Sequence, residues 1–230
     1  MNPIQRNFEH VYKKIYTIAH NFNRDPSKIT LVAVSKTKPV TTILEAINTG
    51  HRSFGESYAQ EAIKKIVWLR DKRKIKDLIW HFIGHVQINK SRLIAENFDW
   101  CHTVDRKKIV ENLNEKRLKN LIPLNVLIQI NISGEITKGG ILPDEMFKLA
   151  EFISKCPALC LRGLMAIPFK TNIFQDQLSS FNRMNTLYKN LQSIYPTIDT
   201  LSLGMTGDMS AAIAAGSSLL RIGTAIFGER

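Results

Sequence analysis

Short apolar segments rich in β-branched residues alternate along the chain with longer segments in which apolar residues recur at helical spacing. The apolar segments lie at residues 29–35, 53–55, 78–84, 100–104, 124–133, 159–167, 199–204 and 217–222. Amphipathic segments follow each of the first seven, among them 56–70, 143–155 and 174–194, and another at 4–22 precedes the first. Because short apolar runs are typical of buried strands and the longer pattern of helices, the sequence predicts eight strand–helix repeats after an N-terminal helix.

Strict alternation of strands and helices implies a parallel sheet with right-handed crossovers. Eight repeats in 230 residues favour an α/β fold of one domain, a (β/α)8 TIM-type barrel covering residues 1–230. A doubly wound sheet is the alternative. In a barrel, functional residues gather at the carboxyl ends of the strands, so the residues that follow each apolar segment are the candidates.

Composition is that of an ordinary globular protein, with 44% apolar and 23% charged residues. No window contains the run of about 18 apolar residues that a membrane helix needs, and the N-terminus lacks the apolar centre of a signal peptide. The three cysteines, Cys101, Cys156 and Cys160, are too few for a disulfide framework. We therefore expect a cytoplasmic protein with reduced thiols and no membrane partner.

The formal charge of +12 raises the question of a nucleic-acid partner. Much of the excess positive charge lies in 64–76 and 105–120, where Lys and Arg are interleaved with apolar residues at helical spacing. Solvated outer faces of helices explain that pattern. Since the sequence also shows no aromatic platform or basic recognition helix, no nucleic-acid partner is expected.

Metal binding is not predicted either. The segment "HFIGH" separates His81 and His85 by four residues, but that spacing shares a face only on a helix, and this pair spans the end of a predicted strand. Cys156 and Cys160 have no second ligand pair nearby and are expected to pack against apolar neighbours.

A lysine follows the first predicted strand, in "LVAVSKTKPV" at residues 31–40. A lysine amine forms a Schiff base with an aldehyde when burial or a cationic neighbour lowers its pKa. Lys36 is therefore a candidate for covalent binding of an aldehyde. The alternative is a solvated lysine at a strand end.

Glycines and hydroxyls cluster after the last two predicted strands. Gly204 and Gly207 flank Thr206, and Gly223 precedes Thr224. Backbone N–H groups in such turns bind anions, and barrels bind phosphate in the loops after strands seven and eight. Glycines that merely form tight turns are the alternative. A lysine at one strand end and a phosphate site nearby together favour pyridoxal phosphate, an aldehyde with a phosphate group.

Six segments in order make the sequence resemble the pyridoxal phosphate homeostasis protein family. They are "LVAVSKTKP", "FGES", "WHFIGHVQINKSR", "VLIQINIS", "RGLMAIP" and "LSLGMTGDMSAAIAAGSSLLRIGTAIFGER". The fold of that family resembles the barrel domain of alanine racemase. The resemblance implies pyridoxal 5'-phosphate as cofactor, held as a Schiff base on Lys36. It places the phosphate among Ser202, Thr206, Gly223 and Thr224, and Arg221 against the pyridine nitrogen.

Other positions depart from the family pattern or have two interpretations. Ser57 replaces the asparagine expected near the cofactor ring, and His85 replaces a usual proline. Thr206 and Gly207 stand where the usual pattern is Ser-Asp, which keeps a hydroxyl for the phosphate. His81, Met165 and Lys38 also lie near strand ends, where they would line the pocket. Packing of His81 and Met165, and solvation of Lys38, are the alternatives.

Arg221 bears on the choice between a carrier and an enzyme. An arginine beside the ring nitrogen disfavours its protonation, so the ring is a weaker electron sink. The racemase resemblance also calls for a second base, a tyrosine from a following domain, which we do not expect because the sequence ends at "IFGER". We therefore expect a non-catalytic, monomeric carrier that holds the cofactor and supplies recipient apo-enzymes. An amino-acid racemase-like enzyme is the alternative.

Overall fold

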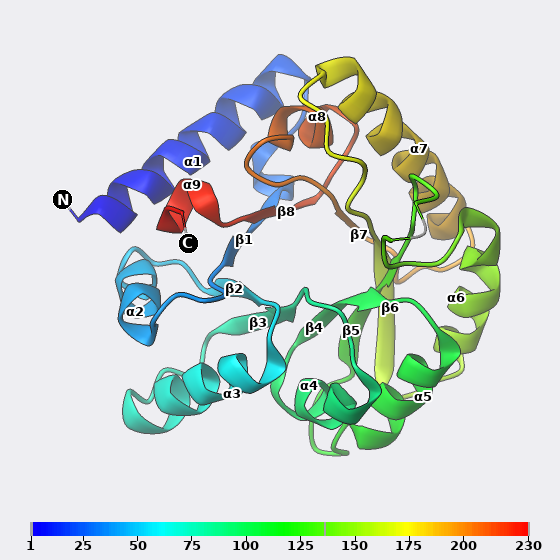
Figure 1. Ribbon diagram of the computed structural model, residues 1–230, viewed down its shortest axis with the longest axis horizontal. Helices are drawn as coiled ribbons and strands as arrows, with labels where there is room; N and C mark the ends of the chain where they lie inside the picture. The colour runs from blue at the N-terminus through cyan, green and yellow to red at the C-terminus, as the bar shows by residue number, and fades with distance from the viewer. Residues whose placement is uncertain (1, 136, 230) are drawn as a thin grey trace.

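Eight parallel strands close into a barrel in the computed structural model, which describes residues 2–135 and 137–229. The strands follow one another around the barrel in chain order, and β8 pairs with β1 (Figure 1). The predicted TIM-type barrel is confirmed, and the doubly wound alternative is wrong because a doubly wound sheet has two open edges. The strands are β1 (Thr30–Val34), β2 (Ser53–Glu56), β3 (Ile79–Phe82), β4 (Trp100–Val104), β5 (Leu124–Gln129), β6 (Leu159–Met165), β7 (Thr200–Ser202) and β8 (Leu219–Ile222).

Helices surround the barrel, as Figure 1 shows. They are α1 (Pro3–Asn21), α2 (Val40–Asn48), α3 (Ala59–Val67), α4 (Ser91–Asn97), α5 (Lys107–Lys116), α6 (Met146–Ser154), α7 (Phe174–Gln192), α8 (Met209–Ala214) and α9 (Thr224–Phe227). Short turns of other helix types are Pro26–Lys28, Trp68–Lys72, Ile88–Lys90 and Pro143–Glu145. No helix in the described part of the chain is both long enough and apolar enough to span a bilayer.

Several predicted boundaries differ from the structure, among them those of the segments 56–70 and 124–133. The segment 56–70 was expected to be helical from its start, but Glu56 is the last residue of β2 and α3 begins only at Ala59. The Glu56 carboxylate is buried at the end of β2, where the buried Lys65 of α3 contacts it. The fifth strand was expected to reach residue 133, but it ends at Gln129, and Ile130 forms an isolated bridge with Ile141.

Side chains alternate between two buried layers. Leu31 and Ala33 of β1 belong to the apolar core between the strands and the helices, whereas Val32 between them is buried outside that cluster. In the second layer, β3 and β4 contribute the polar residues His81 and His102, which are both almost fully buried. The barrel interior is therefore partly polar, unlike the apolar interiors typical of this fold.

The pairing of β1 with β8 determines which loops meet at the carboxyl end of the barrel. Val32 is the register partner of Arg221, and Ala33 that of Ile222. A Cβ placed on Gly223 would lie 3.3 Å from the carbonyl oxygen of Val34, so the chain beyond β8 passes directly beside the end of β1. The loop that carries Lys36 is thereby adjacent to the segment that carries Gly223 and Thr224.

Candidate functional site

Lys36 lies two residues beyond the end of β1, at a tight turn. The backbone N–H of Lys38 donates to the carbonyl of Ser35 at 3.1 Å, which closes a four-residue turn with Lys36 and Thr37 at its centre. Thr37 has a φ of 65°, a value that costs energy in a threonine and is often associated with functional sites. The turn keeps Lys36 half-buried at the carboxyl end of the barrel.

A buried network of charged side chains contacts the residues on both sides of Lys36. Lys65 of α3 donates to Glu56 Oε1 at 2.8 Å and to the carbonyl of Ser35 at 3.0 Å. The hydroxyl of Ser35 donates to the same oxygen of Glu56 at 2.7 Å. Glu61 contacts Lys65 at 2.6 Å and accepts from the backbone N–H of Thr37 at 2.8 Å. Both residues that flank Lys36 are thus fixed by side chains from β2 and α3.

Lys65 corrects one sequence-based interpretation. The basic segment 64–76 was expected to form a solvated helix face, but Lys65 is only 7% exposed. Glu56 is fully buried, and burial raises its pKa, although Lys65 acts in the opposite direction. Its second oxygen, Oε2, has no hydrogen-bond partner among the described residues. Neither Glu56 nor Lys65 was predicted from the sequence, although "FGES" places a glutamate directly before the candidate Ser57.

Arg221 of β8 is buried inside the barrel, where it contacts Ser202 of β7. Its guanidinium donates to the Ser202 hydroxyl at 2.5 Å, to the Ser202 carbonyl at 2.7 Å and to the carbonyl of Ala166 at 3.0 Å. Among the described residues no ion pair involves Arg221. Burial lowers its pKa to about 10, so the side chain is still cationic at neutral pH. The hydrogen bonds of this buried cation all go to neutral acceptors, while the Asp208 carboxylate acts on its pKa in the direction opposite to burial.

Two histidines extend the chain of hydrogen bonds from Ser202 across the barrel. His102 Nδ1 lies 3.1 Å from the Ser202 hydroxyl, and His102 Nε2 lies 3.0 Å from His81 Nδ1. Burial lowers the pKa of His81 to about 3 and that of His102 well below its usual range, so both rings are neutral at pH 7. His81 was predicted to line the pocket or to pack. It belongs to this chain of hydrogen bonds, and its ring stacks on Trp100 with 5.5 Å between centroids.

The candidate phosphate-binding residues lie in two neighbouring turns. The turn after β7 is closed by Asp208, which accepts from the backbone N–H of Met205 at 2.6 Å and leaves Thr206 half-buried. Gly204, with φ at 92°, begins this turn, and a Cβ there would lie 2.6 Å from that of Ala212.

Thr224, the first residue of α9, is exposed. Ser202 differs from these residues, because it is fully buried beneath them.

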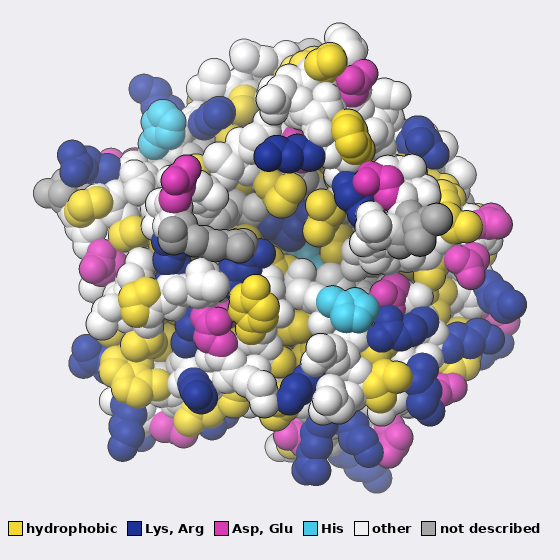
Figure 2. All heavy atoms as spheres, in the orientation of Figure 1, with side chains coloured by type: hydrophobic (Ala, Val, Ile, Leu, Met, Phe, Trp, Pro, Cys, Tyr) yellow, Lys and Arg dark blue, Asp and Glu magenta, His cyan; other side chains and the backbone are white. Residues whose placement is uncertain are grey.

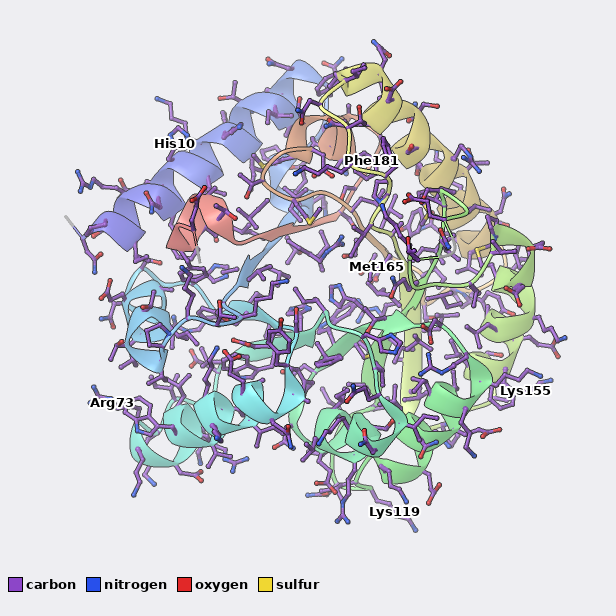
Figure 3. The ribbon with its side chains drawn as sticks, viewed as in Figure 1. His10, Arg73, Lys119, Lys155, Met165 and Phe181 are labelled. Atoms are coloured by element: carbon purple, nitrogen blue, oxygen red, sulfur yellow. The ribbon has the colours of Figure 1, made fainter. Side chains whose placement is uncertain are left out.

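The remaining candidates occupy different depths. Met165 of β6 is fully buried, is the register partner of Ser202, and lies toward the middle of the barrel in Figure 3. Ser57 is half-buried and lines a cavity of about 310 Å³ together with the exposed His85. A Cβ at Gly84 would lie 2.1 Å from the carbonyl of Ser57, so only glycine permits this approach of the two loops. Lys38 donates to the carbonyl of Glu229 at 2.7 Å, which ties the chain near its end to the Lys36 loop.

Figure 2 shows a hollow at the centre of the face viewed, with Lys or Arg and His side chains in its depth and hydrophobic side chains around it. No group of acidic, histidine or cysteine side chains in residues 2–135 and 137–229 is arranged to hold a metal ion. All three cysteines are free thiols.

Comparison with known proteins defines the class of barrel to which this arrangement belongs. The model of the family "Alanine racemase, N-terminal domain" matches residues 14–230. The pyridoxal phosphate homeostasis protein of Escherichia coli (strain K12) is 52% identical over 230 residues, which are 100% of this chain and 98% of that protein. The protein of the same name from Vibrio alginolyticus is 50% identical, over 100% of this chain and 99% of its own length.

A solved structure gives the same result. PipY from Synechococcus elongatus, with PLP bound, superposes with a TM-score of 0.79 at 31% identity over 93% of this chain and 99% of that chain. The chain belongs to the pyridoxal phosphate homeostasis protein family. Both resemblances inferred from the sequence, to this family and to the alanine racemase barrel, are confirmed.

Proposed function

We propose that this protein binds pyridoxal 5'-phosphate at the carboxyl end of its barrel, with Lys36 as the residue that holds the aldehyde carbon as a Schiff base. The observation that carries the proposal is the β1–β8 pairing, which puts the Lys36 turn beside Gly223 and Thr224. A lysine amine and a hydroxyl-bearing turn at the same strand ends match the two ends of the cofactor. The relatives' name and the PLP-bound PipY structure support it.

The donors present fit this cofactor. A buried guanidinium whose hydrogen bonds all go to neutral acceptors suits an unprotonated ring nitrogen, since protonation of the ring would place two positive charges in contact. We assign Arg221 to that nitrogen. Bound there, pyridoxal phosphate supplies an aldehyde for exchange with amines and an electron sink that Arg221 leaves weak.

Burial divides the other candidates into two groups. Thr206, Gly223 and Thr224 are open enough to meet the phosphate, and we assign them to it. Ser202 and Met165 are fully buried, so we assign them to the layer below the phosphate. Ser202 orients Arg221, and Met165 packs beside Ser202, its register partner. Ser57 then lies at the rim of the site, beside its cavity.

Glu56 and Lys65 are assigned to positioning Lys36. They touch both of its neighbours in sequence, Ser35 directly and Thr37 through Glu61. A turn fixed on both sides limits the positions open to the lysine between them, which lowers the entropy lost when the aldehyde binds.

The role that we propose is to hold the cofactor and release it to recipient apo-enzymes in the cytoplasm, as a monomer and without catalysis of its own. The free thiols are compatible with a reducing compartment. The relatives' name supports homeostasis, and the Arg221 assignment supports weak carbanion chemistry.

The test compares transfer with catalysis. The loaded protein should restore activity to the apo-form of an unrelated pyridoxal phosphate enzyme. In deuterated water it should exchange the α-proton of L- or D-alanine slowly, if at all, and without inversion. Inversion at an ordinary enzyme rate of about 1–1000 per second would instead establish the racemase alternative.

A further inference from the structure

A second cavity, of about 300 Å³, lies at the amino end of the barrel, opposite the proposed cofactor site. Residues at or before the first position of the strands line it, including Lys28, Thr30, Ser53, Ile79, Trp100 and Thr200. His81 also lines it, and is 2% exposed. The ring nitrogen Nε2 of His81 has no hydrogen-bond partner among the described residues. A buried polar atom without a partner costs free energy, so a partner from outside the chain is expected in this cavity.

The hydrogen-bond chain inside the barrel decides whether this nitrogen is a donor or an acceptor. Arg221 can only donate, so the Ser202 oxygen accepts from it and the Ser202 proton is available for His102 Nδ1. His102 then carries its proton on Nε2 and donates it to His81 Nδ1. His81 must therefore carry its own proton on Nε2. The reverse order would leave the buried hydroxyl of Ser202 with no acceptor in the described structure.

The charges around the cavity favour an anion as the partner. Lys28 and Arg162 bring two positive charges, and Asp199 brings one negative charge that is already bound by Arg162 through two contacts. Arg162 also lies over the Trp100 ring, 4.9 Å from its centroid, and Trp100 in turn stacks on His81. The lining thus has a net positive charge, hydroxyls from Thr30, Ser53 and Ser218, and a buried N–H donor.

We propose that this amino-end cavity is a binding site for a small oxyanion, a phosphate or carboxylate group, recognised by the Nε2–H of His81 and by Lys28. The proposal does not depend on the cofactor site. We assign an anion to the cavity because a hydrogen-bond donor and an excess of positive charge together disfavour a cation. A neutral ligand would leave that positive charge without a partner.

The experiment uses the full-length protein saturated with pyridoxal phosphate, so that added phosphate meets a filled cofactor site. Histidine side-chain nitrogens are labelled and observed by NMR while inorganic phosphate or acetate is added at constant ionic strength. We expect a saturable shift of the His81 Nε2–H resonance with at least one of the two probes. The two arms distinguish phosphate from carboxylate recognition. A resonance that does not move with either probe would show that neither anion binds beside His81 and would overturn the proposal.

Two variants make the assignment specific. Lys28→Glu reverses a charge at the cavity and should weaken the probe's binding by about tenfold. Lys64→Glu, the matched control, makes the same change on the exposed face of α3 and should leave binding unchanged. Equal weakening by both variants would mean that net charge alone attracts the anion, and would also overturn the proposal. Because Lys28 and Lys64 are both exposed, neither variant is expected to prevent folding.

Discussion

The guanidinium of Arg221 and the hydroxyl of Ser202 are 2.5 Å apart inside the barrel, where neighbouring strands β7 and β8 end. This contact links the two parts of the molecule for which we propose binding sites. On one side is Arg221, which we assign to the cofactor ring, and on the other Ser202 begins the hydrogen-bond chain through His102 to His81.

Ser202→Ala should destabilise the fold by about 1–3 kcal/mol, because it removes an acceptor from Arg221 and leaves His102 Nδ1 buried without a donor. Urea unfolding measures this change. Ser154→Ala is the control, since its hydroxyl bonds only the carbonyl of Glu151 at an exposed position, and it should change stability little. Equal effects of the two substitutions would contradict the role given to Ser202.

Lys65→Met should cost about 3–5 kcal/mol, since it leaves the buried carboxylate of Glu56 without its cation. Lys64→Met on the same helix is exposed and should be nearly neutral. Replacing both Glu56 and Lys65 with methionine should recover part of the loss, because no unpaired charge then remains buried. A double variant no more stable than Lys65→Met would show that the pair itself supplies net stability.

Stability should depend on pH through His51. Burial lowers its pKa in the folded protein to about 4, below the usual value of about 6.5 in an unfolded chain. The unfolded state therefore binds a proton more readily than the folded state. The contribution of His51 to folding stability is present in full above pH 6.5 and is lost as pH falls toward 4. From pH 7 to pH 5 the loss is about 2 kcal/mol.

His51→Phe keeps a ring beside Phe8 and Phe54 and removes the titration. The difference in unfolding free energy between the parent and this variant should shift by that amount in favour of the variant as pH falls from 7 to 5. Groups common to both proteins, such as Glu56, cancel in this difference. A difference that is independent of pH would contradict the prediction.

The proposed phosphate contacts predict a selective loss of affinity. Thr206→Val with Thr224→Val removes two hydroxyl donors to a dianion, each worth about 1.5–3 kcal/mol, so pyridoxal phosphate should bind at least tenfold more weakly. Pyridoxal, which lacks the phosphate, should bind the double variant and the parent equally. Thr186→Val, at an exposed site on α7, is the control for the substitution itself. Unchanged affinity for the phosphorylated cofactor in the double variant would place the phosphate elsewhere.

The barrel could be predicted from the sequence because each repeat carries its own local signal, a β-branched apolar run and then a helical pattern. The predicted 100–104 strand matches β4, and the order of the eight strands follows from the alternation alone. The candidate site was predictable in part for the same reason: strand ends such as those before Lys36 and Gly223 meet at one end of a barrel.

The contacts that fix the site depend on register and could not be predicted in this way. Glu56 and Lys65 are nine residues apart across a strand–helix boundary, so neither the helical nor the strand period brings them together. His102 and Ser202 are 100 residues apart and meet only because the barrel closes. Burial of Lys65 within a basic segment has no local signal, because charged residues are usually solvated on such helix faces.

Covalent mapping of the cofactor tests the central proposal most directly. The protein, loaded with pyridoxal phosphate and reduced with borohydride, should carry a phosphopyridoxyl group on the peptide that contains Lys36, and the Lys36→Ala variant should lose both this adduct and the yellow absorbance. Lys38 and Lys65, the neighbouring amines, should remain unmodified in the parent. A stable adduct found only on another lysine, with Lys36→Ala as strongly coloured as the parent, would contradict the assignment of Lys36.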